Sequence, residues 1–274
     1  MKKSLSILLV SILTLSLAGC GAKEQSVDTG ANAASNKNKV IKIGASPVPH
    51  KEILEVVQPL LEKKGYKLDI KEFTDYVQPN LALNDGELDA NFFQHVPYLE
   101  NMKKEKNLDL TYTAKIHLEP MGLYSKKIKD LKEMKDGATI AVPNDATNEA
   151  RALRVLETAG LIKLKSGDLV TALDITENPK NIKITELEAA QLPRTLDDVE
   201  AAIINTNYAL EAKLNPATDA LAIESKDSPF ANILAVKTKD KDKDYIKALT
   251  EALTSPEVRK FIEEKYKGSI LPAF

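Results

Sequence analysis

The chain has 274 residues but a single cysteine, Cys20, which limits its chemistry at the outset. No disulfide can form within the chain and no zinc site can be built from several cysteines, so stability has to come from a hydrophobic core. The sequence also contains no P-loop, no dinucleotide-binding fingerprint and no Gly-x-Ser-x-Gly motif. It therefore offers no recognisable catalytic nucleophile.

Charges of the two signs are nearly balanced, with 38 lysines and arginines against 40 aspartates and glutamates. The first 19 residues hold two of the lysines and no acidic residue, so the rest of the chain has a formal net charge of −4. A mildly acidic surface favours neither nucleic acid nor anionic lipid headgroups, and we expect no nucleic-acid partner. Beyond residue 17, no apolar run is long enough to cross a bilayer.

The N-terminus has the pattern of an export signal. Lys2 and Lys3 precede an uncharged apolar run over residues 5–17, which ends in Leu17-Ala18-Gly19-Cys20. The run is too short to span a bilayer comfortably, as is typical of a signal peptide. The last four residues resemble the lipobox of bacterial lipoproteins. This implies that residues 1–19 are removed, that Cys20 is acylated, for example with palmitate, and that the protein is lipid-anchored to the extracytoplasmic face of the cell membrane. The alternative is a free thiol within an ordinary signal.

The segment over residues 20–38 is rich in small and polar residues and contains no aromatic residue. This composition predicts a flexible linker that holds the folded body away from the lipid anchor. The 255 residues that follow the signal exceed the roughly 100–200 of a typical domain, so we expect two lobes, each with a core of its own.

Short β-rich runs alternate with amphipathic helices from residue 40 onward, which is the pattern of α/β folds with helices packed on sheets. Strands are predicted over residues 40–43, 68–73, 88–93, 139–142, 182–184, 201–204 and 233–236, and an extended stretch over 115–125. Helices are predicted over residues 50–64, 75–84, 96–106, 147–159, 245–253 and 256–266.

The order of these elements predicts two α/β lobes. We expect the first part of lobe 1 over residues 39–118, lobe 2 over residues 119–236, and C-terminal helices over residues 237–274 that return to lobe 1. This arrangement leaves a cleft between the lobes, and clefts between domains are where small ligands usually bind.

Asn148 and Arg151 are the first candidates for ligand binding. They lie three residues apart in a helix that is expected to begin just after an apolar strand, so their side chains share one face of its first turn. The start of a helix offers free backbone N–H groups, and an arginine binds a carboxylate through two hydrogen bonds. The pair is a candidate carboxylate site; the alternative is a capped surface helix in which Arg151 pairs with Glu149 or with solvent.

A second group of candidates surrounds a strand that ends near Phe93 and His95. Alternation along this strand places Asn91 and Phe93 on one face and Phe92 on the other. Aromatic rings and an imidazole at the carboxyl end of a strand can wall a pocket, and Tyr76 could supply the opposite wall. The alternative is that the phenylalanines are core residues and that Tyr76 is half-buried at the surface.

A third candidate is Asn205, which follows the apolar strand at 201–204 and opens the sequence Asn-Thr-Asn-Tyr. An amide both donates and accepts hydrogen bonds, which suits the charged head group of an amino acid. The alternative is that Thr206 or Asn207 caps a helix.

The three histidines are His50, His95 and His117. Their spacing matches neither an i, i+4 nor a His-x-His pattern, and the sequence indicates no cluster of acidic residues with them. We therefore expect no metal site and no cofactor.

Five segments taken together resemble the NlpA-type lipoprotein family, in order and over essentially the whole chain after the signal. They are residues 44–50, 73–76, 93–99, 143–148 and 204–209. Members of this family are the methionine-binding components of ABC importers. The resemblance implies a two-lobed, type II periplasmic-binding-protein fold with a ligand cleft between the lobes, and a protein that is not an enzyme.

The resemblance also implies roles for particular residues. Arg151 and Asn148 would hold the α-carboxylate of methionine and Asn205 its head group, while the thioether side chain would be enclosed by Tyr76, Phe93, His95 and Tyr98. His50 and His117 would lie near the cleft without an assigned role. The implied partners are methionine or a related small amino acid, an ABC transporter permease with its ATPase, and the membrane through the lipid anchor, with the binding protein as a monomer.

Three alternatives stay open. The ligand could be a methionine-containing dipeptide or another small apolar amino acid, because one methylene in a pocket changes the binding free energy by only about 1–3 kcal/mol. The chain could also be a surface-anchored hydrolase that uses His95 with a carboxylate, although no nucleophile accompanies it. Finally, it could be an adhesin that has lost its ligand, against which the presence of Arg151 counts.

Overall fold

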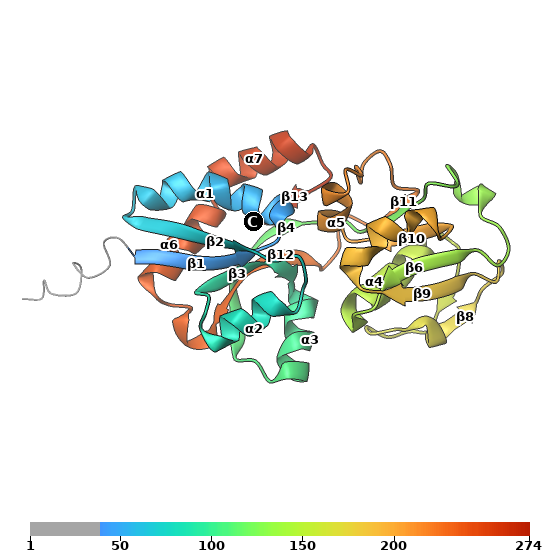
Figure 1. Ribbon diagram of the computed structural model, residues 1–274, viewed down its shortest axis with the longest axis horizontal. Coiled ribbons are helices and arrows are strands. Elements are labelled where there is room, and N and C mark those ends of the chain that lie inside the picture. Colours follow the sequence, from blue (N-terminus) through green and yellow to red (C-terminus); the bar gives the residue numbers. More distant parts are fainter. Residues whose placement is uncertain (1–38) are drawn as a thin grey trace, which may run out of the picture. The chain divides into compact units, whose positions relative to one another are not determined.

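Two β-sheets organise residues 39–274, which are the residues that the computed structural model describes (Figure 1). The predicted signal over residues 1–19, Cys20 and the linker over residues 20–38 lie outside the described residues. Both sheets belong to the same compact unit of the chain. No helix within residues 39–274 combines the length and the apolar character that crossing a membrane requires.

The first sheet has six strands in the order β13-β4-β12-β3-β1-β2. β1 (Lys39–Ala45) pairs in parallel with β2 (Tyr66–Glu72) on one side and β3 (Ala90–His95) on the other. β12 (Ala231–Lys237) runs antiparallel between β3 and β4 (Leu110–Leu118), and the short β13 (Leu271–Pro272) completes the sheet beside β4.

Helices cover both faces of this sheet (Figure 1). One face packs against α1 (Glu52–Glu62), α6 (Asp244–Leu253) and α7 (Pro256–Tyr266), and the other against α2 (Gln78–Asp85) and α3 (Val96–Lys106). Phe92 lies in the core on the α1 face and Phe93 in the core on the α3 face, which confirms the predicted alternation along β3.

The second sheet has five strands in the order β11-β5-β10-β6-β9. These are β5 (Gly122–Tyr124), β6 (Thr139–Pro143), β9 (Lys183–Leu187), β10 (Ala201–Ile204) and β11 (Ala222–Ile223). α4 (Ala146–Thr158) covers one face, and the short helical segments η4 (Ala189–Asp197) and α5 (Thr206–Glu211) cover the other. A hairpin of β7 (Lys163–Leu164) and β8 (Ile175–Glu177) lies outside this sheet.

The longer predicted elements are confirmed, and two helices match to the residue. α3 begins where the His95 side chain accepts from the backbone N–H of Tyr98, and it ends at Asn107, whose φ of 54° is left-handed. α7 begins at the cap Ser255 and ends before Lys267, which is also left-handed. The helix predicted over residues 50–64 is shorter, because it starts with the irregular turn η1 (Pro47–Lys51).

The chain passes from the first sheet to the second between β4 and β5 and returns between β11 and β12. The predicted boundary at residue 236 is wrong, because β12 hydrogen-bonds to β3 and β4 of the first sheet. Its apolar pattern indicates a buried strand but not the sheet that the strand joins. We use first lobe for the elements around the six-stranded sheet and second lobe for those around the five-stranded sheet.

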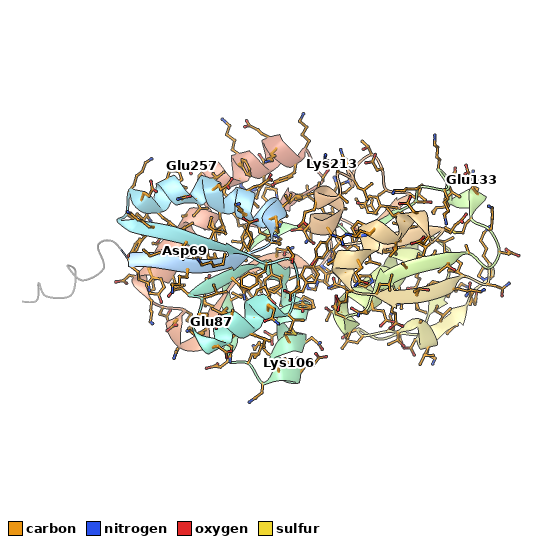
Figure 2. The ribbon with its side chains drawn as sticks, in the orientation of Figure 1. Asp69, Glu87, Lys106, Glu133, Lys213 and Glu257 are labelled. Atoms are coloured by element: carbon orange, nitrogen blue, oxygen red, sulfur yellow. The ribbon has the colours of Figure 1, made fainter. Side chains whose placement is uncertain are left out.

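Charged side chains lie mainly at the surface. Figure 2 shows Lys106, Glu133 and Glu257 pointing away from the ribbon, and all three are exposed. Many ion pairs are of the same exposed kind, such as Lys163 with Glu177, and contribute at most about 1 kcal/mol each. Buried charged side chains therefore stand out, and several of them gather where the two lobes meet.

Candidate ligand-binding site

A cavity lies between the lobes, beside the carboxyl ends of β3, β6 and β10. The space between its lining atoms amounts to about 330 Å³, counting the part that is open to solvent. Seven of its lining residues are those that the sequence analysis singled out, namely Tyr76, Phe93, His95, Tyr98, Asn148, Arg151 and Asn205. The twelve lining residues come from six separate segments of the chain, which meet around one space.

Three rings from the first lobe form what we call the aromatic wall: Tyr76, Phe93 and Tyr98. Their ring centroids lie 5.9–6.2 Å apart. The hydroxyl of Tyr98 donates to the backbone oxygen of Tyr76 at 2.9 Å, and the hydroxyl of Tyr76 donates to Oδ1 of Asn207 at 2.6 Å. Burial raises the pKa of both tyrosines, so both hydroxyls stay protonated and donate. The aromatic wall is therefore apolar toward the cavity and fixed at its polar ends.

His95 connects the two lobes. Its Nδ1 accepts from the backbone N–H of Tyr98 at 3.1 Å, and its Nε2 lies 3.2 Å from Oδ1 of Asn148 in the second lobe. Because an amide oxygen only accepts, Nε2 carries the proton. Burial, and then the positive charge of Arg151, lower the pKa of His95 to about 3, so the ring is neutral at neutral pH.

Asn148 is held by partners from both lobes. Asp145 caps α4 by accepting from the backbone N–H of Asn148 at 3.0 Å, and its carboxylate also accepts from the Asn148 side chain at 2.9 Å. On its other end, Oδ1 of Asn148 accepts from Nδ2 of Asn205 at 2.9 Å as well as from His95. These bonds fix the orientation of Asn205 and His95 toward the cavity.

Arg151 is buried, and its partner is not the predicted alternative, Glu149. Its Nε donates to Oε1 of Glu224 at 2.9 Å, while Nη2 donates to the other oxygen of that carboxylate and to the backbone oxygen of Glu119. Glu149 accepts instead from the backbone N–H of Ala172. These hydrogen bonds are donated by Nε and Nη2, and Nη1 of the guanidinium takes no part in them.

Two amide atoms on cavity residues are buried and have no hydrogen-bond partner within residues 39–274: Oδ1 of Asn205 and Nδ2 of Asn207. Almost all buried polar atoms in proteins are paired, because an unpaired one costs about 1–3 kcal/mol. One of these atoms is an acceptor and the other a donor. They are ready to bind a ligand with groups of both kinds.

The sequence analysis missed five lining residues, which are Gln94, Glu119, Thr206, Asn207 and Asn232. Asn207 belongs to the same Asn-Thr-Asn-Tyr sequence as Asn205, which was a usable signal. The capping alternative for Thr206 and Asn207 is wrong, because α5 begins after Asn205 and Thr206 donates instead to the backbone oxygen of Pro120. No sequence signal pointed to Asn232, which reaches the cavity only because β12 joins the first sheet.

The expectation that no acidic residue clusters with the histidines is also wrong. His50, His117 and Glu119 place their ligand atoms within 4.8 Å of one another, and all three side chains are buried. His50 comes from η1 and His117 from the end of β4, two residues before Glu119. Only the His-x-Glu spacing of the last two residues was visible in the sequence.

Comparison with known proteins gives one family. The model of the NlpA lipoprotein family matches residues 41–274. The D-methionine-binding lipoprotein MetQ of Salmonella typhi is 42% identical over 260 residues, which are 93% of this chain and 92% of that protein. The methionine-binding lipoprotein MetQ of Bacillus subtilis is 42% identical over 279 residues, 99% of each chain.

A solved structure of a nutrient binding protein from Burkholderia cenocepacia bound to methionine is 51% identical, with a TM-score of 0.83. It covers 85% of this chain and 100% of that chain. Identity at this level over this length confirms the two-lobed α/β fold of the periplasmic-binding-protein type that the resemblance implied. This chain belongs to the NlpA lipoprotein family.

Proposed function

We propose that the protein binds methionine in the cavity between its lobes and delivers it to the permease of an ABC importer. The observation that carries the proposal is the combination of an aromatic wall on one side of the cavity with two unpaired, buried amide atoms on the other. An α-amino acid with an apolar side chain supplies what each side lacks. The methionine-binding relatives support methionine as that amino acid.

The head group of the ligand would contact the polar side of the cavity. Nη1 of Arg151 and Nδ2 of Asn207 are donors for the α-carboxylate, and Oδ1 of Asn205 and the carboxylate of Glu119 are acceptors for the ammonium group. Asn148 acts by orienting Asn205. Together these groups fit a zwitterion and leave the side chain to point toward the first lobe.

The thioether side chain would lie against the aromatic wall and His95. Burying a methionine side chain contributes about 1.5–3 kcal/mol, and a sulfur atom beside an aromatic ring adds about 0.3–1.5 kcal/mol. The second contribution is the one that leucine lacks. Three rings around one cavity therefore favour methionine over an aliphatic side chain of similar size.

The importer context extends to the membrane. Acylation of Cys20 anchors the protein to the extracytoplasmic face of the cell membrane, and the segment over residues 20–38 lets the folded body reach the permease, which works with its ATPase. The lipobox pattern and the lipoprotein family support this part of the proposal. The protein acts as a monomer, which light scattering would check.

Calorimetric titration tests the ligand. The purified protein, freed of bound ligand by unfolding and refolding, is titrated with L-methionine, D-methionine, leucine, norleucine and glycyl-methionine. We expect methionine to bind more tightly than leucine and norleucine. Preference for the dipeptide or for leucine would keep the site and change the ligand. If none of these ligands binds, the result would contradict the proposal and favour the hydrolase or adhesin alternatives.

Metabolic labelling tests the anchor. Cells that express the protein are grown with radioactive palmitate, and the same is done with the variant Cys20→Ala. We expect label on the wild-type protein only, and we expect the variant to stay in the aqueous phase when a detergent extract is separated. Label on the variant would contradict acylation at Cys20.

A further inference from the structure

Beside the cavity, two histidines converge on one carboxylate. Nε2 of His50 and Nε2 of His117 lie 3.3 Å and 2.6 Å from Oε1 of Glu119. Glu119 lines the cavity, whereas the two histidines are not among its lining residues. We propose that His50 and His117 are positioning residues, which act through Glu119 to make the site select ligands with an ammonium group. This inference rests on the proposed function and adds to it the origin of the head-group selectivity.

The hydrogen bonds around His50 establish where its proton lies. Its Nε2 is 3.1 Å from Oδ1 of Asn232, an atom that only accepts, so Nε2 carries the proton. Its Nδ1 is 2.8 Å from Oγ of Ser46, which therefore donates to it. The N–H of His50 thus bonds to Asn232, and this bond together with the one from Ser46 holds Nε2 at 3.3 Å from Oε1 of Glu119.

His117 differs from His50 in that only its Nε2 has a polar partner within the described residues. Its Nε2 forms the short contact with Glu119, and its Nδ1 is buried without a hydrogen-bond partner within the described residues. A proton on Nε2 makes a hydrogen bond to the carboxylate, whereas a proton on Nδ1 would be buried and unpaired. Phe92 packs edge-on against both imidazoles and holds the two rings in place. The centroid of its ring lies 4.7 Å from that of His50 and 5.3 Å from that of His117.

The distances favour hydrogen bonds over a metal site. Two ligand atoms that each lie about 2.0–2.1 Å from a tetrahedral zinc ion are roughly 3.3 Å apart. The 2.6 Å between Nε2 of His117 and Oε1 of Glu119 is shorter than that and lies close to the roughly 2.7–2.9 Å of a charge-assisted N–H···O hydrogen bond. The cluster is therefore built to orient a carboxylate.

The charges around Glu119 leave one position for a cation. Burial lowers the pKa of His50 to about 4 and that of His117 to about 3, so both rings are neutral at neutral pH. The charge of Arg151 is matched by Glu224. Burial raises the pKa of Glu119, and the neighbouring His50 and then Arg151 oppose this rise only in part. An ammonium group in the cavity would supply the missing positive charge and favour the ionised carboxylate.

The test compares two ligands that differ only in the amino group, L-methionine and 4-(methylthio)butanoate. Calorimetry on the wild-type protein should show a preference for methionine of at least about 30-fold, because an unpaired buried charge is costly. His117→Phe keeps a ring of similar size but has no donor. We expect this variant to lose roughly 10-fold or more of the preference, mainly through weaker binding of methionine.

Four further variants separate positioning from a structural role. His117→Gln keeps a donor and should retain most of the preference. Glu119→Gln should abolish the preference for methionine. Adding His117→Phe to this variant should not lower the preference further, because the histidine acts through the carboxylate. His95→Phe is the matched control, since His95 is a buried histidine that does not contact Glu119. This variant should bind both ligands more weakly and leave the preference for methionine unchanged.

Several outcomes would overturn the inference. They are equal weakening of both ligands in His117→Phe, an unchanged preference in Glu119→Gln, or tight Zn²⁺ binding that His117→Phe abolishes. If His117→Phe does not fold, Glu119→Gln carries the test, because it changes neither size nor shape. If the wild-type protein binds another amino acid instead of methionine, only the proposed ligand fails, and that amino acid and its des-amino counterpart replace the pair.

Discussion

The two lobes contribute different chemistry to the cavity. The first lobe supplies the aromatic wall and His95, whereas the second supplies Asn148, Arg151 and the amides that follow β10. Under the proposed function, this difference would divide recognition: the first lobe would contact the side chain of the ligand, and the second lobe, together with Glu119 between the lobes, would contact its head group. Neither lobe forms a site alone, because each presents only one wall.

Hydrogen bonds between the lobes hold the two walls together. Tyr76 donates to Asn207 at 2.6 Å, Tyr208 donates to the backbone oxygen of Thr74 at 2.9 Å, and His95 bonds to Asn148. Each bond has its donor and acceptor in different lobes. These bonds join the two walls into one site, and the contribution of each wall can be tested by changing one wall at a time.

The largest effect is expected from the head-group wall. Arg151→Gln alone would leave the carboxylate of Glu224 buried without its cation, which costs about 3–5 kcal/mol of stability. The double variant Arg151→Gln/Glu224→Gln avoids this and should weaken methionine binding by roughly 100-fold or more in calorimetry, since a buried charge pair with the ligand is lost. Arg154→Gln, one turn along α4 and paired with Glu157 at the surface, is the control and should bind normally.

The second largest effect is expected on the stability of the fold when the pH is lowered. It should differ between the lobes, because all three histidines lie in the first lobe. A histidine whose folded pKa is lowered destabilises the fold as pH falls below its unfolded pKa of about 6.5, since only the unfolded state takes up the proton. The folded pKa of His95 is about 3, so its destabilising effect grows as the pH falls from about 6.5 to about 3. Second-lobe carboxylates such as Asp145 and Glu149, whose pKa is raised, act in the opposite direction.

The measurement is the free energy of unfolding in urea at pH 6 and at pH 4.5. Between these two pH values the protein should lose less of its free energy of unfolding when His95 is replaced with glutamine. The difference should be about 1.4 kcal/mol per pH unit, which is the contribution of one proton. An unchanged slope would mean that His95 takes up its proton in the folded state and would contradict the buried, neutral ring.

The smallest effect is expected from one bond between the walls. Tyr76→Phe keeps the ring in the aromatic wall and removes the hydroxyl that donates to Asn207. A net hydrogen bond is worth about 0.5–1.5 kcal/mol, so methionine should bind roughly 2- to 12-fold more weakly, with no change in its preference over norleucine. A changed preference would show that the hydroxyl also reads the side chain of the ligand.

Local patterns in the sequence predicted most of the elements but only part of the site. α3 and α7 carry their own caps, and β3 has an alternation that separates Phe92 from Phe93, so these features could be read from neighbouring residues. The short segments η4 and α5 were not predicted, because they are stabilised by packing on the second sheet.

The residues that the sequence did not reveal come from distant segments. Asn232 and the cluster of His50, His117 and Glu119 depend on β12 lying between β3 and β4 and on η1 reaching the end of β4. Contacts of this kind follow from which strands pair, and the apolar pattern of a strand does not contain that information. The misplaced boundary at residue 236 has the same cause.

The central place of β12 also governs the order in which the chain can fold. The second lobe is one continuous stretch, so it can fold as soon as β11 is available. The first sheet has β12 in its middle, and that strand follows the whole second lobe in the sequence. A chain that emerges from its N-terminus therefore completes its later lobe first, while β3 and β4 wait for β12, which lies more than a hundred residues further along the chain.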